Sequence, residues 1–220
     1  MWGNAHAGRV TTHTTGAPAR TPQGERTRAM RRRLLEATVE CLVELGWAGT
    51  TTTVVSERAG VSRGAQLHHF PSKQDLVVAA VEHLSERRRD DMVAAAADLP
   101  EKGRTRAVLD VLAAQFVSPV FFAALELWVA ARTDAELRAA VGPLERRIGR
   151  ETHVYALELF GVDESRADNR ALVQATLDLL RGFGLAASLS DDTKRRDAVL
   201  DAWAPILDDR LVLDDSLETS

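Results

Sequence analysis

The stretch AGVSRGAQLHHFPSKQDL, residues 59–76, combines a glycine turn, two adjacent histidines and a proline. Gly60 follows a short helical segment and supports a sharp turn. Ser62 is a helix N-cap for a second short helix, which ends before Pro71 because proline disfavours helical geometry in the residue that precedes it. Two short helices joined by such a turn are typical of a helix-turn-helix.

The two histidines lack the spacing of a metal site. Adjacent residues on a helix point about 100° apart, so His68 and His69 cannot converge on one ion as an i, i+4 pair does. Cys41 is the only cysteine, and the other histidines are scattered along the chain. The sequence also lacks a G-x-S-x-G nucleophile elbow and a phosphate-binding glycine loop. We therefore expect no metal, no cofactor and no enzyme, although a triad assembled in space would leave no such signature.

Charge is spread unevenly over the chain. The net charge is −4, yet residues 1–75 carry ten Lys and Arg against six Asp and Glu, whereas the remainder carries eighteen against twenty-six. A basic front on an acidic body is expected if only the front meets a polyanion, and chance clustering of arginines is the alternative.

Several features bear on the compartment. The single cysteine and the absence of an apolar segment in MWGNAHAGRV, residues 1–10, favour the cytoplasm. The longest apolar run, residues 120–131, is interrupted by Glu126 and is too short to span a bilayer. We therefore expect no membrane partner.

The pattern as a whole predicts an all-α protein. Residues 1–24 are rich in Thr, Gly, Ala and Pro without a period, which is typical of a disordered arm. Helical spacing then begins at Glu25, and Gly46 ends the first helix. Further helices are expected at 54–59, 63–70, 73–97, 104–116, 119–132, 134–160, 168–189 and 194–208. The expected domains are a three-helix helix-turn-helix head over 25–75, a larger helical effector-binding and dimerisation body over 76–210, and a flexible tail over 211–220.

The second short helix is expected to lie in the major groove of DNA, with its N-terminal turn facing base edges. Arg63 can donate two hydrogen bonds to guanine, and Gln66 can read adenine if it faces outward. Gly64 and Ala65 are small enough to let the helix approach DNA closely. His68, His69 and Lys73, at the end of this helix and the start of the next, can reach phosphate oxygens. The alternative is a structural helix corner with solvated histidines.

The segment GWAGTTTTVVSERAGVSRGAQLHHFPSKQDLVVAAVEHL, residues 46–84, resembles the DNA-binding domain of the TetR (AcrR-like) family of transcriptional regulators. The matching features are a Gly-aromatic pair after the first helix, a threonine pair, AGVS at the turn, a His-Phe pair, one proline and a Ser-Lys pair at the head of the fourth helix. The resemblance covers about fifty residues, from Glu25 to Val77.

The resemblance implies a role for particular positions. The threonines before the second helix usually touch the phosphate backbone in this family, which implicates Thr51, Thr52 and Thr53. The family's recognition-helix positions correspond to Arg63, Gly64, Ala65, Leu67, His68 and His69, and its helix-four lysine corresponds to Lys73. The family commonly has Thr-Leu-Tyr where this chain has residues 65–67. Either Leu67 replaces the DNA-contacting tyrosine, with an apolar contact to a thymine methyl, or the helix is rotated and Gln66 faces out.

The segment SPVFFAALELWVAARTD, residues 118–134, is apolar nearly all round and is expected to be a central, buried helix. Polar residues there need a partner, which is a ligand, another side chain or solvent. The candidate ligand-binding residues are Phe122, Glu126, Arg132 and His153. The mixed charge run ERRIGRE, residues 145–151, is interpreted as a solvated helix face.

One recognition helix reads only a few base pairs, so a twofold homodimer on half-sites about one helical turn apart is expected. The last two helices combine large apolar residues with small ones, and two copies would form a four-helix bundle, as the resemblance also implies. The expected interface residues are Leu172, Leu177, Leu180, Phe183, Gly184, Ala187, Val199, Trp203 and Ile206. The alternative is that these are core helices of a monomer.

With the resemblance, these patterns predict a dimeric transcriptional regulator, most simply a repressor that leaves a palindromic double-stranded DNA operator when a small molecule binds the body. Two alternatives stay open. One is a DNA-binding regulator without a small-molecule effector. The other is a helical enzyme or carrier of small molecules with a vestigial DNA-binding head.

Overall fold

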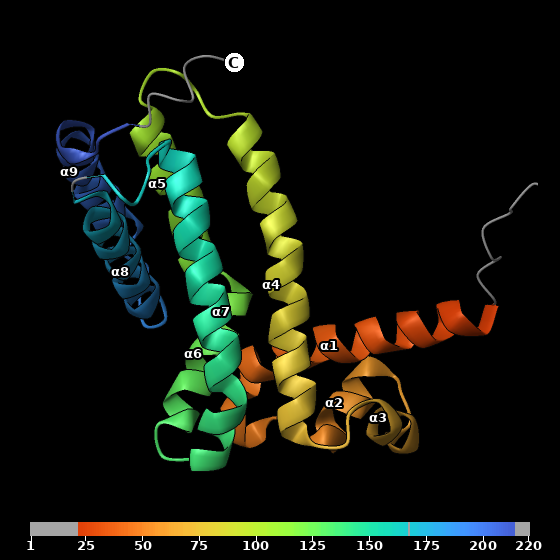
Figure 1. The fold of residues 1–220 in the computed structure, drawn as a ribbon. Coiled ribbons are helices and arrows are strands. Elements are labelled where there is room, and N and C mark those ends of the chain that lie inside the picture. Colours follow the sequence, from red (N-terminus) through yellow and green to blue (C-terminus); the bar gives the residue numbers. More distant parts are fainter. Residues whose placement is uncertain (1–21, 167, 214–220) are drawn as a thin grey trace, which may run out of the picture.

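The structure is a computed structural model that describes residues 22–166 and 168–213. The described residues form helices joined by short turns (Figure 1), and the predicted all-α class is confirmed. The helices are α1 (Pro22–Gly49), α2 (Thr52–Ala59), α3 (Arg63–His69), α4 (Lys73–Ala97), α5 (Arg104–Phe116), α6 (Pro119–Ala131), α7 (Ala135–Phe160), α8 (Asn169–Ala187) and α9 (Thr193–Arg210). Most of the predicted N-terminal arm, residues 1–21, lies outside the described residues, and the helix α1 already begins at Pro22 rather than at Glu25.

The helix α1 is bent at Gly46, whose φ of 65° and ψ of −178° are not helical. Glycine adopts such dihedral angles readily because it has no Cβ. Before the bend, Leu34 and Leu42 are fully buried. After the bend, a last turn ends at Thr50, whose Oγ1 donates to the Gly46 carbonyl at 2.8 Å. The predicted helix end at Gly46 is therefore the point at which the helix axis breaks.

Side-chain caps and one glycine turn define α2 and α3. The Thr51 hydroxyl accepts a hydrogen bond from the Val54 amide at 3.2 Å and begins α2. Gly60 ends α2 in the left-handed conformation, with φ 62° and ψ 41°, which costs a glycine little. Ser62 begins α3 by accepting from the Ala65 amide at 3.3 Å. The predicted helix-turn-helix is confirmed at residue level.

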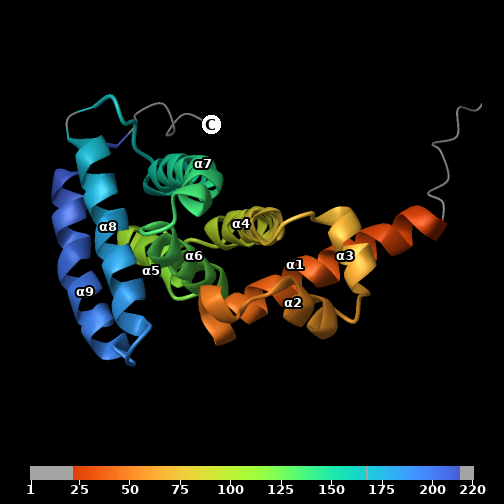
Figure 2. The same ribbon diagram turned by 90° about the horizontal axis from the view of Figure 1, so that it is seen from below.

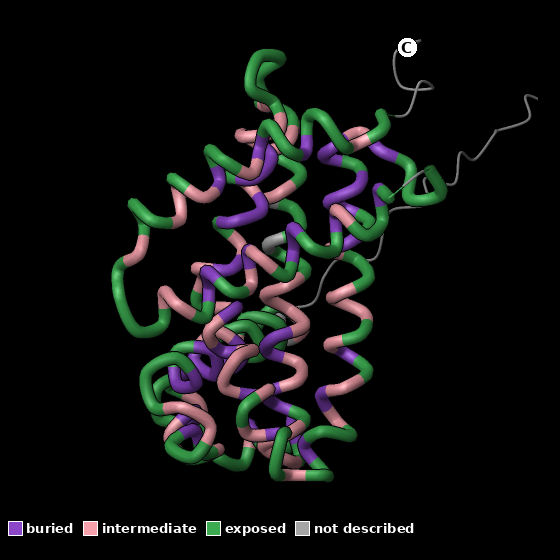
Figure 3. Tube along the Cα trace, turned by 90° about the vertical axis from the view of Figure 1, so that its left-hand side faces the viewer, coloured by how far each residue is buried: buried purple, intermediate pink, exposed green. Residues whose placement is uncertain are grey.

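The long helix α4 leads from this head into the body and lies beside α7 (Figure 1). The helices α8 and α9 pack side by side on the side of the body remote from α2 and α3 (Figure 2). Buried residues recur between exposed ones along most of the helices (Figure 3). The buried apolar residues form two clusters, one around α1, α2, α4 and the other around α5, α8 and α9. The helices α6 and α7 contribute to both clusters, and they are the connection between head and body.

The chain after α9 is held, which corrects part of the predicted flexible tail. Leu213 forms an isolated antiparallel bridge with Val162. The fully buried Asn169 donates from Nδ2 to the carbonyls of Asp163 (2.9 Å) and Val212 (2.8 Å), and its Oδ1 accepts from the Val212 amide at 3.0 Å. A buried amide with all these bonds fixes the backbone that it contacts. Residues 211–213 are therefore ordered, and residues 214–220 lie outside the described residues.

Among the described residues, no single helix is long and apolar enough to cross a membrane. The pair α5 and α6 meets the length and composition test only when taken together, and the two helices are bent by 56° where they meet.

Candidate nucleic-acid interface and ligand cavity

The helix α3 presents one face to solvent. Arg63, Gly64, Leu67 and His68 are exposed, and they recur at the spacing of one side of a helix. Ala65 and His69 are half-buried at the edges of this face. This exposed face carries a guanidinium and an imidazole, which can donate hydrogen bonds to base edges and phosphate oxygens. It also carries an apolar side chain, which can contact an apolar group of a base.

Gln66 lies on the opposite face of α3. Its side chain is 0% exposed, and its Nε2 donates to the Phe70 carbonyl at 2.8 Å. A side chain buried in this way cannot reach a base edge, so the expectation that Gln66 contacts DNA is wrong for this structure. Leu67, which is 42% exposed, takes the outward position instead. Of the two alternatives for this departure from the family pattern, the structure shows the one in which Leu67 faces out.

The two histidines lie edge to face. Their ring centroids are 5.4 Å apart at an interplanar angle of 72°, and the His69 ring is 6.4 Å from that of Phe70. Within residues 22–166 and 168–213, no group of three or more His, Cys, Asp or Glu side chains is arranged to hold a metal ion. The exposed His68 and the half-buried His69 are placed at the C-terminal end of the recognition helix, beside its outward face.

The predicted threonines lie at the start of α2. Thr51 and Thr53 are exposed and Thr52 is half-buried, so hydroxyl groups line this end of α2. Thr51 already accepts the capping hydrogen bond, and its hydroxyl hydrogen is left to donate to another group. This geometry suits a phosphate oxygen, which is an acceptor.

Trp47, just after the bend in α1, connects three helices. The Lys73 ammonium at the start of α4 donates to the Trp47 carbonyl and lies 3.6 Å from the centroid of the indole ring. Burial lowers the pKa of Lys73. From α6, the Glu126 carboxylate accepts the Trp47 amide hydrogen bond at 3.2 Å. An ammonium carries three N–H donors, so Lys73 can hold Trp47 and still offer one to DNA.

The body contains a cavity of about 230 Å³ between α4, α5, α6, α7 and α8. Its wall is largely apolar and includes Phe116, Phe121, Leu127, Trp128 and Ile148. A largely apolar cavity with a few polar groups is the usual form of a small-molecule site.

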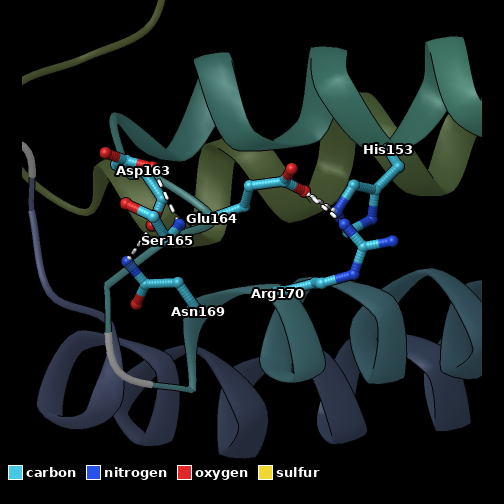
Figure 4. A network of polar contacts seen from close by, with 6 residues as sticks. All are labelled: His153, Asp163, Glu164, Ser165, Asn169 and Arg170. Atoms are coloured by element: carbon cyan, nitrogen blue, oxygen red, sulfur yellow. Dashed lines mark hydrogen bonds and ion pairs between the residues drawn. The ribbon is translucent and has the colours of Figure 1, made fainter.

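None of the four predicted ligand-binding residues lines this cavity. Phe122 packs in the core, and Arg132 is exposed at the end of α6, while Glu126 holds Trp47. His153 is buried on another side of α7, where its Nε2 lies 3.5 Å from the Glu164 carboxylate, which also binds Arg170 at 2.7 Å (Figure 4). The sequence neighbours Phe121 and Thr152 do line the cavity, because adjacent helical residues point about 100° apart.

Glu145 was not predicted to line a ligand cavity, because it is the first residue of the charged run 145–151, which was interpreted as a solvated helix face. In the structure it lines the cavity, and its Oε2 accepts a hydrogen bond from the Trp128 indole at 2.9 Å. Burial raises the pKa of Glu145, and the Trp128 hydrogen bond and the nearby Arg181 partly oppose this rise. A signal for it was present, since Val141, Leu144, Glu145 and Ile148 share the spacing of one helix face.

The comparisons with known proteins agree with this arrangement. Residues 34–80 match the family model described as bacterial regulatory proteins, tetR family. The chain is 33% identical over 199 residues to the HTH-type transcriptional regulator CymR of Pseudomonas putida, with 88% of this chain and 97% of the relative covered. The chain belongs to the TetR family. It is a helix-turn-helix transcriptional regulator of that family.

Solved structures of TetR-like proteins share the fold. A TetR transcription regulator from Haloarcula marismortui superposes with a TM-score of 0.68 at 22% identity, covering 84% of this chain and all of the other. The multidrug binding protein EbrR, complexed with imidazole, superposes with a TM-score of 0.54 at 25% identity, covering 79% of this chain and 93% of the other.

The predicted dimer residues of this TetR-family chain fall into two groups. Leu177, Leu180, Phe183 and Gly184 are buried within the single chain, which removes them from the proposed interface. Gly184 is close to α5 and α6, because a Cβ at this position would lie 2.6 Å from Cε1 of Phe121 and closer still to the Phe116 carbonyl oxygen. Of the others, Ile206 is exposed, whereas four are half-buried: Leu172, Ala187, Val199 and Trp203.

Proposed function

We propose that this TetR-family chain is a repressor that binds a palindromic DNA operator as a homodimer and leaves it when a small molecule occupies the body cavity. Its action requires no enzymatic step and no cofactor, and it takes place in the cytoplasm, where the operator is. The observation that carries the proposal is the outward face of α3, on which Arg63 and His68 are exposed, together with the exposed threonines Thr51 and Thr53 at the start of α2.

The proposed DNA contacts follow from exposure and chemistry. Arg63, at the first position of α3, donates to a guanine edge, and Leu67 contacts a thymine methyl. Thr51, Thr53 and the histidines donate to phosphate oxygens, which fixes the register of the helix in the groove. Thr52, Gly64, Ala65 and Lys73 lie at the edges of this contact surface.

The outer faces of α8 and α9 are the proposed dimer surface. Small and apolar residues are exposed there at helical spacing: Ala171, Ala175, Gly182 and Leu185 on α8, and Ala198, Ala202 and Ile206 on α9. Gly182 has open space where a Cβ would be, so its backbone is free for close approach by a partner helix. Two such pairs would form an intersubunit four-helix bundle, which is the twofold arrangement that a palindrome requires.

A ligand response is supported by the cavity and by EbrR, a relative described as a multidrug binding protein. The helix α6 gives the response a route. Its residues Leu127 and Trp128 line the cavity. The adjacent residue Glu126 accepts the hydrogen bond from the Trp47 amide. A shift of α6 that follows ligand binding therefore acts on the bend of α1 and, through Lys73, on the start of α4.

The experiment is fluorescence anisotropy of the full chain on DNA from its own upstream region, titrated with salt and then with candidate effectors. We expect saturable nanomolar binding, a palindromic footprint and a steep logarithmic salt slope. Weak binding that is equal on all sequences, including genomic fragments selected on the immobilised protein, would overturn the proposal. Specific DNA binding that no effector weakens would support the DNA-binding function and contradict the ligand response.

A further inference from the structure

Among the side chains that the structure describes, two charged ones line the cavity of the body, Glu145 from α7 and Arg181 from α8. Their surroundings differ, and the difference bears on which ligand charge the cavity accepts. In an apolar cavity a charge without a partner is costly, so a ligand is selected by the group that lacks one.

Arg181 already has partners. Its NH1 lies 2.5 Å from Oδ1 of Asp178, one helical turn away on α8. Its guanidinium carbon is 5.9 Å from the centroid of the Phe116 ring and 6.0 Å from that of Trp128, so it also lies against two aromatic rings. The positive charge of Arg181 is therefore neutralised by Asp178, and its side chain is more than one-third exposed to water, which screens it further.

Glu145 has one hydrogen bond and no ion pair. Its Oε2 accepts from the Trp128 indole, whereas Oε1 has no hydrogen-bond partner among the described residues. No Lys or Arg nitrogen of these residues lies within ion-pair distance of it, Arg181 included. The carboxylate thus presents an unused acceptor in a cavity whose walls are mostly apolar.

The aromatic residues around Glu145 favour the same sign of ligand charge. The Phe121 ring packs edge to face on Phe116, with centroids 5.5 Å apart, and on Trp128, with centroids 5.7 Å apart. The faces of aromatic rings carry negative electrostatic potential and attract cations, as the Arg181 guanidinium against Phe116 and Trp128 illustrates. A carboxylate with a free oxygen and a group of aromatic rings therefore make one cation-selective wall.

We propose that the effector is a small organic cation, a protonated amine attached to an aromatic body, whose ammonium donates to Oε1 of Glu145. The role of this cation as an effector rests on the proposed ligand response, whereas its binding depends only on the residues of the cavity. The size agrees, because a cavity of about 150 Å³ holds benzene and this one, at about 230 Å³, has room for a substituted or fused aromatic ring.

The test compares three probes of one shape that differ in charge: 1-naphthylmethylamine, 1-naphthylmethanol and 1-naphthoate. Isothermal titration of the full-length protein at neutral pH measures the Kd of each. We expect the amine to bind at least tenfold more tightly than the alcohol, and the naphthoate to bind most weakly. Equal or tighter binding of the naphthoate would overturn the proposal, and so would an alcohol that equals the amine.

The Glu145→Gln variant identifies the partner. It keeps the side-chain shape and an oxygen that accepts from Trp128, so we expect a folded protein in which amine affinity falls at least tenfold and alcohol affinity changes less than threefold. Glu158→Gln, an exposed residue near the end of the same helix, removes the same charge and is the matched control. Amine affinity that is unchanged in Glu145→Gln, or that falls equally in both variants, contradicts the assignment.

If Glu145→Gln does not fold, Trp128→Phe serves instead, because it keeps the carboxylate and an aromatic ring. We then expect amine selectivity over naphthoate to persist, and its loss would count against the proposal. Failure of the ligand class and failure of the proposed function are distinguishable. An amine that binds without changing operator affinity would contradict only the proposed ligand response. Release of the protein from its operator by anionic compounds would contradict only the assignment of a cationic effector.

Discussion

The head and the body cavity differ in what most of their named polar side chains bind. In the head, Thr50, Thr51 and Ser62 bond to nearby backbone groups and the buried Gln66 amide donates to Phe70, although Oε1 of Gln66 and Oγ of Ser56 are buried without a partner among the described residues. In the cavity, Oε1 of Glu145 has no hydrogen-bond partner among the described residues. This difference fits a DNA-binding head whose geometry is set before DNA binds, and a cavity whose carboxylate obtains its partner from a bound ligand.

The largest effect is expected in the head. Arg63→Ala removes a guanine contact from each half-site, and one such contact contributes about 1–3 kcal/mol, so a dimer loses affinity for its operator about a hundredfold or more. Anisotropy on operator and on scrambled DNA measures the change. The control is Arg210→Ala, an exposed arginine at the end of α9. Equal losses on the two DNAs would show that Arg63 binds only phosphate.

The body tolerates change least where α8 meets α5 and α6. Gly184→Ala places a methyl group against the Phe116 backbone and the Phe121 ring, and overpacking of this kind costs about 1–3 kcal/mol of unfolding free energy. We expect a Tm lower by several degrees in thermal unfolding followed by circular dichroism. Gly149→Ala, in open space on α7, is the matched control and is expected to leave the Tm unchanged or slightly raised. A tolerated Gly184→Ala would mean that α8 can move away from α5.

The link between the two regions can be removed without removing either. Glu126→Ala deletes the acceptor for the Trp47 amide, so we expect nearly normal operator affinity but an effector-induced loss of affinity that is about fivefold smaller. Glu126→Gln keeps an oxygen acceptor and should restore most of the response. Anisotropy with and without effector gives both quantities. A full response in Glu126→Ala would place the coupling elsewhere.

The smallest effect concerns the unliganded cavity. A carboxyl whose pKa is raised in the folded state binds its proton more tightly there, so its contribution to stability is present at low pH and is lost as pH rises through the folded pKa. Arg181, paired with Asp178, is the charged group that faces Glu145 and opposes this effect. Glu145→Gln should therefore raise the Tm by about 1–3 °C at pH 7 and have no effect near pH 4. A difference that is constant with pH would show that Glu145 does not titrate in this way.

Sequence reasoning succeeded where the signals are local. The caps at Ser62 and Ser72 and the glycine turn at Gly60 act within a few residues, so they could be assigned without tertiary information. It failed where the answer depends on which side of a helix meets its neighbour. Gln66 and Leu67 exchange roles with a small rotation of α3, and Phe122 and His153 each lie one residue from a residue of the cavity wall.

The body shows the same limit at Gly184 and Glu145. Small residues in α8 predicted close approach, but not whether the approaching group belongs to the same chain or to a partner. The charged run 145–151 predicted a solvated face, although one member lies on the apolar stripe that begins at Val141. Such residues need the packing of several helices before their role can be assigned.

The hydrogen bonds of Asn169 have a mechanical consequence. The helices α8 and α9 are joined covalently by the turn at residues 188–192, and at the other end Asn169, the first residue of α8, is bonded to Val212, just after α9. A pair of rods fastened at both ends resists sliding of one rod along the other. We therefore expect the helices α8 and α9 to move together as one rigid unit.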